Sequence, residues 1–323
     1  MLALRVLGAA LAAVVALGLG SSDGRAQSYP QRPVKVIVPA PPGGPTDVPA
    51  RLVADGLQQM LGQPFVVEDR AAGGGVVATG DVARAAPDGY TLLFANSSVL
   101  AVNTALYKSL PYDPARAFAP VGLTFNSPQI MVANNDVPYS TVPEMVAYAK
   151  AHPGKINFAT AAVGTLPHLT AILFKMETGI DALLVTYAGG APAMNAVVAG
   201  QSDVLFDLVR TRVKSGQVKA LCLTGAQRDP DLPNVPTIGE AGYPGVTSTS
   251  WNGIVAPTGT PKAVISLLNA KINEVVSDPA FKAKALGIGL VAAGGTPEEF
   301  TAHIDRERIR WAKVVKAADI KVQ

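Results

Sequence analysis

Short apolar segments alternate with helical segments along most of the chain, and this alternation restricts the fold more than any other feature. The apolar segments are continuous runs, which is typical of strands covered on both faces, so with helices between them they predict parallel α/β sheets. One helix, at 141–151, begins with the capping-box residues Ser140, Thr141 and Glu144. The expected strands are 34–38, 65–68, 91–95, 129–133, 156–159, 183–187, 204–206 and 219–224, and the other expected helices of this part are 48–61, 75–85 and 165–178.

The pattern changes after residue 224. A loop rich in Pro and Gly leads to the apolar stretch TSWNGIVAP and then to three helical segments, 261–277, 279–286 and 297–317. Helices without strands of their own must pack on an existing sheet, so the chain is expected to return to its first domain. We therefore predict one lobe from residues 29–125 plus 251–323 and a second from 126–250. Two crossing segments, 124–132 and 251–255, form a hinge, with a ligand cleft between the lobes.

The N-terminus has the pattern of an export signal. Arg5 precedes an apolar run at 6–19, and Gly24 and Ala26 supply the small residues that a signal peptidase requires. The run is too short to span a bilayer comfortably, since about 20 residues are needed. Residues 1–26 are thus expected to be cleaved, which predicts a soluble periplasmic protein.

Composition and residue types exclude several classes of protein. The formal charge of +3, without a basic patch, gives no reason to expect nucleic-acid binding. Cys222 is the single cysteine, so it can form no internal disulfide, and it lies too far from the signal to carry a lipid; a core thiol in a strand is expected. The three histidines, His152, His168 and His303, belong to no metal-binding or hydrolase motif. We predict no enzyme activity, no metal and no cofactor, with His152 and His303 solvated.

The stretch PAPPGGPTD follows the first expected strand and precedes a helix. Glycine permits positive φ at Gly43 and Gly44, and Thr46 or Asp47 can cap the helix. A strand, a glycine turn and a helix N-terminus place backbone N–H groups and the positive end of the helix dipole at the edge of a sheet. No Gly-Lys-Ser or Gly-Lys-Thr follows, so this is an anion site without a nucleotide P-loop.

A second glycine cluster, residues 73–75, matches G-x-G-x-x-A through Ala78. In a dinucleotide-binding domain the next strand ends in an acidic residue that binds ribose. Here it ends in Asn96 and Ser97, so a tight turn beside the cleft is favoured over nicotinamide binding.

Further turns follow strands in the second half of the chain. In TAAVGTLPHL, Gly164 and Thr165 open a helix, and His168 either contacts a ligand or stabilises the turn. Tyr187, with two glycines after it, and Asp207 end the next two strands.

Several of these motifs together resemble one family. PGGPTD followed by AR, PDGYTLL, NTALYKSLPYDP, GTLPHL, YAGGAPA, PTIGEAG and TSW are similar, in this order and over essentially the whole mature chain, to the Bug family, the extracytoplasmic receptors of tripartite tricarboxylate transporters. The resemblance implies a periplasmic binding protein fold of type II, in which two α/β lobes close on a small carboxylate. It also implies transporter membrane subunits as partners, with a monomeric receptor expected, and ligand carboxylates held mainly by backbone amides.

Carried onto this sequence, the resemblance and the strand-end turns predict one set of ligand-binding residues. They are Gly43, Gly44, Pro45, Thr46, Asp47, Asn96, Ser97, Ala162, Val163, Gly164, Thr165, His168, Tyr187, Asp207 and Arg210.

The chain departs from the family pattern at a few of these positions. Val163 stands where a polar residue is usual, Pro45 replaces a small residue, and a shortened loop carries Arg210 and Arg212. We predict a dicarboxylate with an apolar body, the alternative being that Val163 points into the lobe core. Two alternatives stay open for these arginines: one of them reaches the far carboxylate of the ligand, or both are simply solvated. Two other functions stay open, a ligand sensor for a two-component kinase and a secreted hydrolase or lyase.

Overall fold

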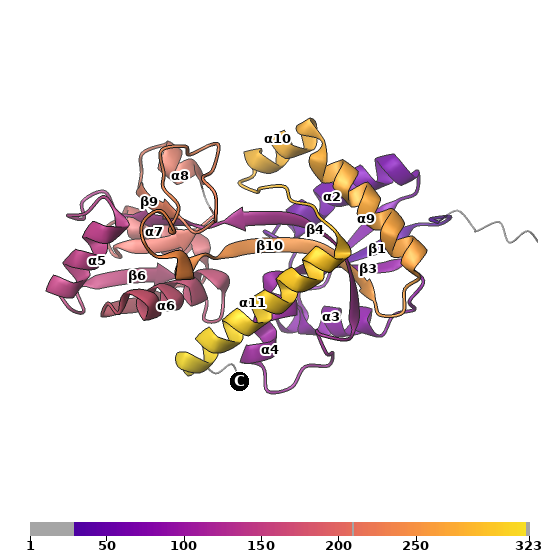
Figure 1. Ribbon diagram of the computed structural model, residues 1–323, viewed down its shortest axis with the longest axis horizontal. Helices are drawn as coiled ribbons and strands as arrows, with labels where there is room; N and C mark the ends of the chain where they lie inside the picture. Colours follow the sequence, from indigo (N-terminus) through magenta and orange to yellow (C-terminus); the bar gives the residue numbers. More distant parts are fainter. Residues whose placement is uncertain (1–28, 209, 321–323) are drawn as a thin grey trace, which may run out of the picture. The chain divides into compact units, whose positions relative to one another are not determined.

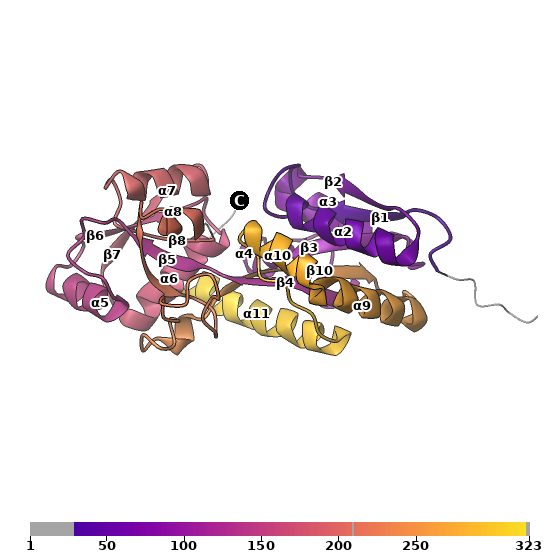
Figure 2. The same cartoon turned by 90° about the horizontal axis from the view of Figure 1, so that it is seen from above.

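The computed structural model describes residues 29–208 and 210–320, so the expected signal peptide at 1–26 lies outside the described residues. The chain forms two five-stranded sheets, each flanked by helices (Figures 1 and 2). We call the part built on the first sheet lobe 1 and the part built on the second lobe 2. Within the described residues, no helix is long and apolar enough to cross a membrane.

Both sheets are mixed, so the expectation of parallel sheets is wrong in part. In lobe 1, β1 pairs in parallel with β2 and β3, whereas β10 is antiparallel to β3 and β4. In lobe 2, β6 is parallel to β7 and β8, whereas β5 is antiparallel to β8 and β9. The antiparallel strands are those that carry the chain from one lobe to the other, which reverses their direction. The sheet orders are β2-β1-β3-β10-β4 and β7-β6-β8-β5-β9.

The strands match the expected apolar runs closely, except that one long strand was missed and residues 249–257 were expected only as an apolar stretch, not as a strand. Burial on both faces explains the match, since Val34, Val36, Ile37 and Val38 are all buried. The bounds are β1 Val34–Val38, β2 Phe65–Asp69, β3 Thr91–Asn96, β5 Ile130–Ala133, β6 Ile156–Thr160, β7 Ala182–Thr186, β8 Val204–Asp207, β9 Lys219–Leu223 and β10 Thr249–Pro257, and the strand that was missed is β4 Phe118–Pro128.

The expected helices are present, and the predicted capping box is confirmed. Glu144 N–H donates to Thr141 Oγ1 at 3.3 Å and Thr141 N–H to Glu144 Oε2 at 3.2 Å. The bounds are α2 Asp47–Leu61, α3 Val76–Ala83, α4 Asn103–Leu106, α5 Val142–Ala151, α6 Leu166–Thr178, α7 Gly190–Val198, α8 Arg210–Lys214, α9 Lys262–Ser277, α10 Pro279–Gly287 and α11 Pro297–Ala317, with single turns at η1 Ala72–Gly75, η2 Ser98–Val102 and η3 Pro244–Val246.

The terminal helices return to the first sheet, as expected. α9 packs against β4 and α2, and α11 packs against β4, η2 and α4 (Figure 1). Phe300 of α11 stacks edge-on against Trp251 of β10 at 5.7 Å, and Trp311 is fully buried. The same apolar cluster includes Leu169 and Ile172 of α6, so α11 contacts both lobes.

The chain passes between the sheets at two points joined by a buried polar network. β4 continues into β5 through Gln129, whose Nε2 donates to Thr170 Oγ1 at 2.7 Å and to Ser248 Oγ at 3.2 Å. Thr224 bonds the backbone of Gln129 and of Ser248. Trp251 already pairs with Asn126 inside the first sheet. We therefore place the second crossing at Ser248, ahead of the expected 251–255; the lobe boundaries at 125 and 250 stay a prediction.

Three side chains outside the predicted site test the sequence-based expectations. Cys222 of β9 is fully buried, and burial raises the pKa of its thiol, so the expectation of a core thiol is confirmed. His152 is exposed, as expected. His303 is partly buried, with its ring 5.2 Å from that of Trp251, so the expectation that it is solvated is wrong. His303 lies on the face of α11 that packs against β10. The mixed charge of the helix sequence gave no indication that this position is buried.

The buried position of His303 should make folding sensitive to acid. Burial, together with the charges of Arg306 and Arg310, lowers the pKa of His303 to about 4, against about 6.5 in an unfolded chain. Between these values the unfolded chain binds the proton and the folded protein does not, so stability falls as the pH falls. We expect this group to remove about 2 kcal/mol of unfolding free energy between pH 7.5 and pH 5.

Urea denaturation of wild type and His303→Gln at both pH values measures this contribution as a difference. The variant should lose less stability on acidification, by about 2 kcal/mol. Equal losses in the two proteins would show that His303 is not the acid-sensitive group.

Candidate functional site

The first glycine turn lies at the carboxyl end of β1 and is already internally bonded. Gly43 has a φ of +72°, and its N–H donates to Asp47 Oδ2 at 2.7 Å. The Gly44 N–H donates to the carbonyl of Pro41 at 3.3 Å. Thr46 occupies the N-cap position without a side-chain cap bond, so neither of the two expected caps forms in the usual way. The N–H groups of Thr46 and Asp47 have no acceptor within the described part of the chain, which leaves them for an anion.

Asp47 lies beneath this turn, and Arg51 forms ion pairs with both Asp47 and Asp69. Arg51 Nε lies 2.7 Å from Asp47 Oδ1, and Arg51 Nη2 donates to Asp69 Oδ2 at 2.6 Å. Burial raises the pKa of Asp47, but the Gly43 N–H and Arg51 outweigh it and the pKa is lowered. Burial and the charge of Asp47 raise the pKa of Asp69. Asp47 thus fixes the conformation of the turn from within. The sequence signal for Arg51 was its i,i+4 spacing from Asp47.

Asn96 brings the end of β3 to the same turn. Its Nδ2 donates to Thr46 Oγ1 at 3.2 Å, and its Oδ1 accepts the N–H of Val99 at 3.2 Å. Ser97 is buried next to it and precedes η2. The adjacent parallel strands β1 and β3 therefore deliver Thr46, Asn96 and Ser97 to one edge of the first sheet.

The second glycine cluster supports the first turn. All three of its glycines have positive φ, and a Cβ on Gly75 would lie 2.6 Å from the carbonyl oxygen of Pro39. Gly75 thus packs against Pro39, the first residue of PAPPGGPTD, and any side chain at position 75 would clash with it. This explains the glycine structurally, without a ligand. The preference for a tight turn over a dinucleotide fingerprint agrees with this packing.

The turn in lobe 2 is built around His168. Gly164 has a φ of +81°, and its N–H donates to His168 Nδ1 at 3.4 Å. Burial lowers the pKa of His168, so near neutral pH its imidazole is uncharged and Nδ1 can accept. Thr165 Oγ1 donates to the carbonyl of Ala162 at 2.7 Å. The N–H groups of Leu166 and His168, in the first turn of α6, have no acceptor among the described residues.

Tyr187 and Asp207 lie at the neighbouring strand ends. The Tyr187 N–H donates to the carbonyl of Thr160 at 2.9 Å, and its hydroxyl lies 3.1 Å from Ser202 Oγ. Asp207 accepts the N–H of Leu208 at 2.5 Å. A Cβ on Gly190, the first residue of α7, would lie 3.6 Å from Asp207 Oδ2. The three parallel strands β6, β7 and β8 thus bring their turns to one edge.

Both arginines after Asp207 have partners within the protein, so the alternative that both are simply solvated is wrong. Arg210 is buried, and its Nε lies 2.5 Å from Asp229 Oδ2. Arg212 is paired with the side chain of Gln217 at the surface. Val163 is 51% exposed, so the alternative that it points into the lobe core is wrong; it borders an apolar hollow of about 420 Å³ together with Ile172.

The two lobes meet beside these turns. A Cβ on Gly164 would lie 2.7 Å from Leu106 Cδ1, so the lobe 2 turn packs directly on α4 of lobe 1. Residues 98–106, which follow Ser97 directly, form η2 and α4, and the sequence analysis did not predict them to be helical. Their signal was the apolar run VLAV, which is buried throughout.

Chemically, the two edges resemble each other. Each presents a helix N-terminus, α2 in lobe 1 and α6 in lobe 2, with N–H groups and the positive end of a helix dipole, which together favour negative charge. The nearby charged side chains of Asp47 and Arg210 are already paired. No group of three or more His, Cys, Asp or Glu that could hold a metal occurs in residues 29–208 and 210–320.

Comparison with known proteins places the chain in a family. Residues 49–320 match the model of the tripartite tricarboxylate transporter family receptor. Protein BugT of Bordetella pertussis is 38% identical over 303 residues, which cover 92% of this chain and 93% of BugT.

Solved structures agree in fold over nearly the whole chain. One, described as R. palustris Rpa4515 with adipate, has 33% identity and a TM-score of 0.78 and covers 91% of this chain and 100% of its own. Another, MatC (Rpa3494) from Rhodopseudomonas palustris with bound malate, has 33% identity and a TM-score of 0.73 and covers 89% and 100%. The fold is therefore the two-lobed α/β fold of a periplasmic binding protein, and the chain belongs to the tripartite tricarboxylate transporter receptor family.

Proposed function

We propose that this protein is a periplasmic receptor that captures a small dicarboxylate between its lobes and delivers it to the membrane subunits of a tripartite transporter. The observation that carries the proposal is the pair of strand-end turns at α2 and α6, each with N–H groups directed beyond the helix N-terminus. Support also comes from two relatives, at 33% identity, whose structures are described with adipate and with malate.

Backbone amides are suited to this task because they do not need a neighbouring cation. A carboxylate that accepts several backbone N–H bonds gains about 1.5 to 3 kcal/mol from each charge-assisted bond. Four or five such bonds across two turns support an affinity near micromolar, about −8 kcal/mol, after the costs of association. In this arrangement the candidate residues Gly43, Gly44, Pro45, Gly164 and Thr165 shape the turns, Asp47 and Arg210 are bonded to neighbouring residues of the protein, and the others of the predicted set line the cleft.

The same arrangement gives no role for catalysis. Its histidine, His168, is buried and bonded to Gly164, and among the described residues no nucleophile is hydrogen-bonded to it. We infer a binding protein without enzyme activity, exported and monomeric. Capture of transporter subunits from solubilised membranes by the immobilised receptor would distinguish delivery from signalling to a sensor kinase.

The ligand is inferred to have an apolar body between its carboxylates. Val163 presents an exposed isopropyl group at the lobe 2 turn, where it can form no hydrogen bond. A ligand hydroxyl buried against it would remain unpaired, at a cost of about 1 to 3 kcal/mol, or about ten- to a hundredfold in affinity.

A thermal-shift and calorimetric comparison of adipate, malate and citrate tests both parts of the proposal. We expect adipate to bind most tightly, and at 100 times its dissociation constant to stabilise the native state by about 2.7 kcal/mol. Val163→Asn should weaken adipate binding and improve malate binding. Tighter binding of citrate or malate to wild type would contradict the apolar-bodied ligand, and no binding of any carboxylate would contradict the receptor itself.

A further inference from the structure

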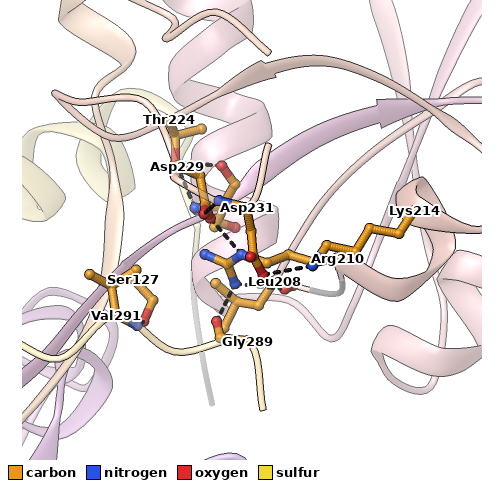
Figure 3. Close-up of polar contacts among 10 residues, drawn as sticks. Ser127, Leu208, Arg210, Lys214, Thr224, Asp229, Asp231, Gly289 and Val291 are labelled. Atoms are coloured by element: carbon orange, nitrogen blue, oxygen red, sulfur yellow. Dashed lines mark hydrogen bonds and ion pairs between the residues drawn. The ribbon is translucent and has the colours of Figure 1, made fainter. Parts of the chain in front are cut away.

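The linker between α10 and α11 lies along the edge of β4 just before the chain crosses to lobe 2. Asn126 N–H donates to the Val291 carbonyl at 3.0 Å, and Ala293 N–H donates to the Thr124 carbonyl at 2.9 Å. The Val291 N–H donates to Ser127 Oγ at 3.0 Å (Figure 3). Because β4 is the edge strand of its sheet, this linker is fixed to lobe 1 at the position of the first crossing.

Lobe 2 reaches this linker through the side chain of Arg210. Arg210 Nη1 donates to the carbonyl of Gly289 and, at 3.4 Å, to the carbonyl of Leu208 (Figure 3). Gly289 has a φ of +81°, and a Cβ there would lie 3.3 Å from Arg210 Nη1 and from the Leu208 oxygen. The close approach of the two segments therefore requires glycine at this position.

Asp229 fixes the orientation of the guanidinium. Arg210 Nε lies 2.5 Å from Asp229 Oδ2, and the two side chains are 4% and 0% exposed. Asp229 Oδ1 accepts the N–H of Asp231 at 2.9 Å, which holds the carboxylate in turn. A buried ion pair is weak evidence for a contribution to stability, because desolvation offsets the attraction. The ion pair instead directs the guanidinium of Arg210 at the Gly289 carbonyl. A role in positioning the two lobes explains this geometry better than a role in stability.

Arg210 also lies close to the candidate site along the chain. It follows Asp207, which ends β8 at the edge that carries the lobe 2 turns. A movement of lobe 2 about the crossings at Gln129 and Ser248 must therefore change the distance between Arg210 and Gly289. Arg210 Nη2 is buried and has no acceptor in the described part of the chain, so the side chain has a donor to spare in this arrangement.

We propose that Arg210 is a positioning residue for ligand capture, a clasp that ties lobe 2 to the 288–293 linker of lobe 1 and limits how far the lobes open. Besides the two covalent crossings, apolar contacts join the lobes at α11 and at the Gly164 turn, and the clasp adds a polar tie beside the first crossing. Affinity depends on the fraction of molecules in the binding-competent arrangement, so a looser clasp weakens binding without removing a ligand contact. Only this effect on affinity rests on the proposed function.

The test compares wild type with a variant that carries Arg210→Met and Asp229→Asn, which removes the clasp without leaving a buried charge unpaired. Spin labels on Gln59→Cys in α2 and Lys150→Cys in α5, both exposed, report the distance between the lobes, and the native Cys222 is buried. In the absence of ligand the variant should show a longer and broader distance distribution. Calorimetry should show at least tenfold weaker adipate binding, and saturating adipate should restore the distance seen in liganded wild type.

A neighbouring residue supplies the matched control. Lys214 of α8 forms an exposed ion pair with Asp231 at 2.7 Å, so Lys214→Met should leave the distances and the affinity unchanged. If the double variant does not fold, Gly289→Ala provides a second probe, because its methyl group displaces the linker from Arg210, and it should widen the distribution as well.

The outcomes separate the possible explanations. An unchanged ligand-free distribution in a folded variant overturns the clasp, and if affinity nevertheless falls, Arg210 contacts the ligand directly. If wild type binds no adipate, the proposed function fails, whereas the ligand-free distances still decide whether the clasp exists.

Discussion

Gly44→Val is expected to lower adipate affinity at least a hundredfold while leaving the protein folded. A Cβ at this position would lie 3.1 Å from the carbonyl oxygen of Pro41, and valine adds two methyl groups to it. The turn must then move away from the N-terminus of α2, where the N–H groups of Thr46 and Asp47 are directed. Loss of two charge-assisted bonds, at about 1.5 to 3 kcal/mol each, gives this decrease.

The fold should survive because the turn lies at the surface and residues 41–45 are exposed or partly buried. Gly62→Val is the matched control at the other end of the same helix. Gly62 has a φ of +69° with nothing within 4 Å of a Cβ, so valine there strains the backbone without touching the turn. Calorimetry with adipate and thermal melting should show two destabilised proteins, of which only Gly44→Val has lost affinity. Binding by Gly44→Val within threefold of wild type would rule out the first turn as the site.

The sequence predicts those elements whose stability is encoded locally. The last helix begins and ends as predicted, because Thr296 caps it with Glu299 and Pro297 occupies its first position. The strand β1, VKVIV, is an apolar run except at the exposed Lys35, and its valines and Ile37 are buried on both faces. The strand β4, FAPVGLTFNSP, has no such run. Its extended conformation comes from pairing with β10, more than a hundred residues later in the chain, and this pairing is invisible to local patterns.

The turns of the site were predictable for a similar reason. Gly43 and Gly164 have positive φ, which the glycine clusters indicated directly. Their hydrogen-bond partners were less accessible to the sequence. That His168 turns its Nδ1 back to Gly164, and that Arg210 pairs with a carboxylate 19 residues away, depends on tertiary packing. The family resemblance gave the order of the motifs but not which N–H groups are already bonded.

The other large effect is expected at Gly253, in the strand that brings the chain back to lobe 1. Gly253→Ala should lower the unfolding free energy by about 3 kcal/mol or more, at the upper end of the range for overpacking. A Cβ there would lie 2.7 Å from the carbonyl oxygen of Gly122 in β4 and 2.7 Å from Phe300 Cε1. The oxygen belongs to a paired strand and cannot move away, and Phe300 is wedged against Trp251.

Urea denaturation measures this loss, with Gly287→Ala in α10 as the matched control. No heavy atom lies within 4 Å of a Cβ on Gly287 and its φ is not positive, so alanine there should be neutral or stabilise by up to about 1 kcal/mol. Adding Phe300→Leu to Gly253→Ala should recover part of the loss, because the shorter side chain removes one of the two clashes. A double-mutant cycle isolates that coupling. If Gly253→Ala is as stable as wild type, or if the two substitutions are simply additive, then α11 does not pack on β10 through this contact.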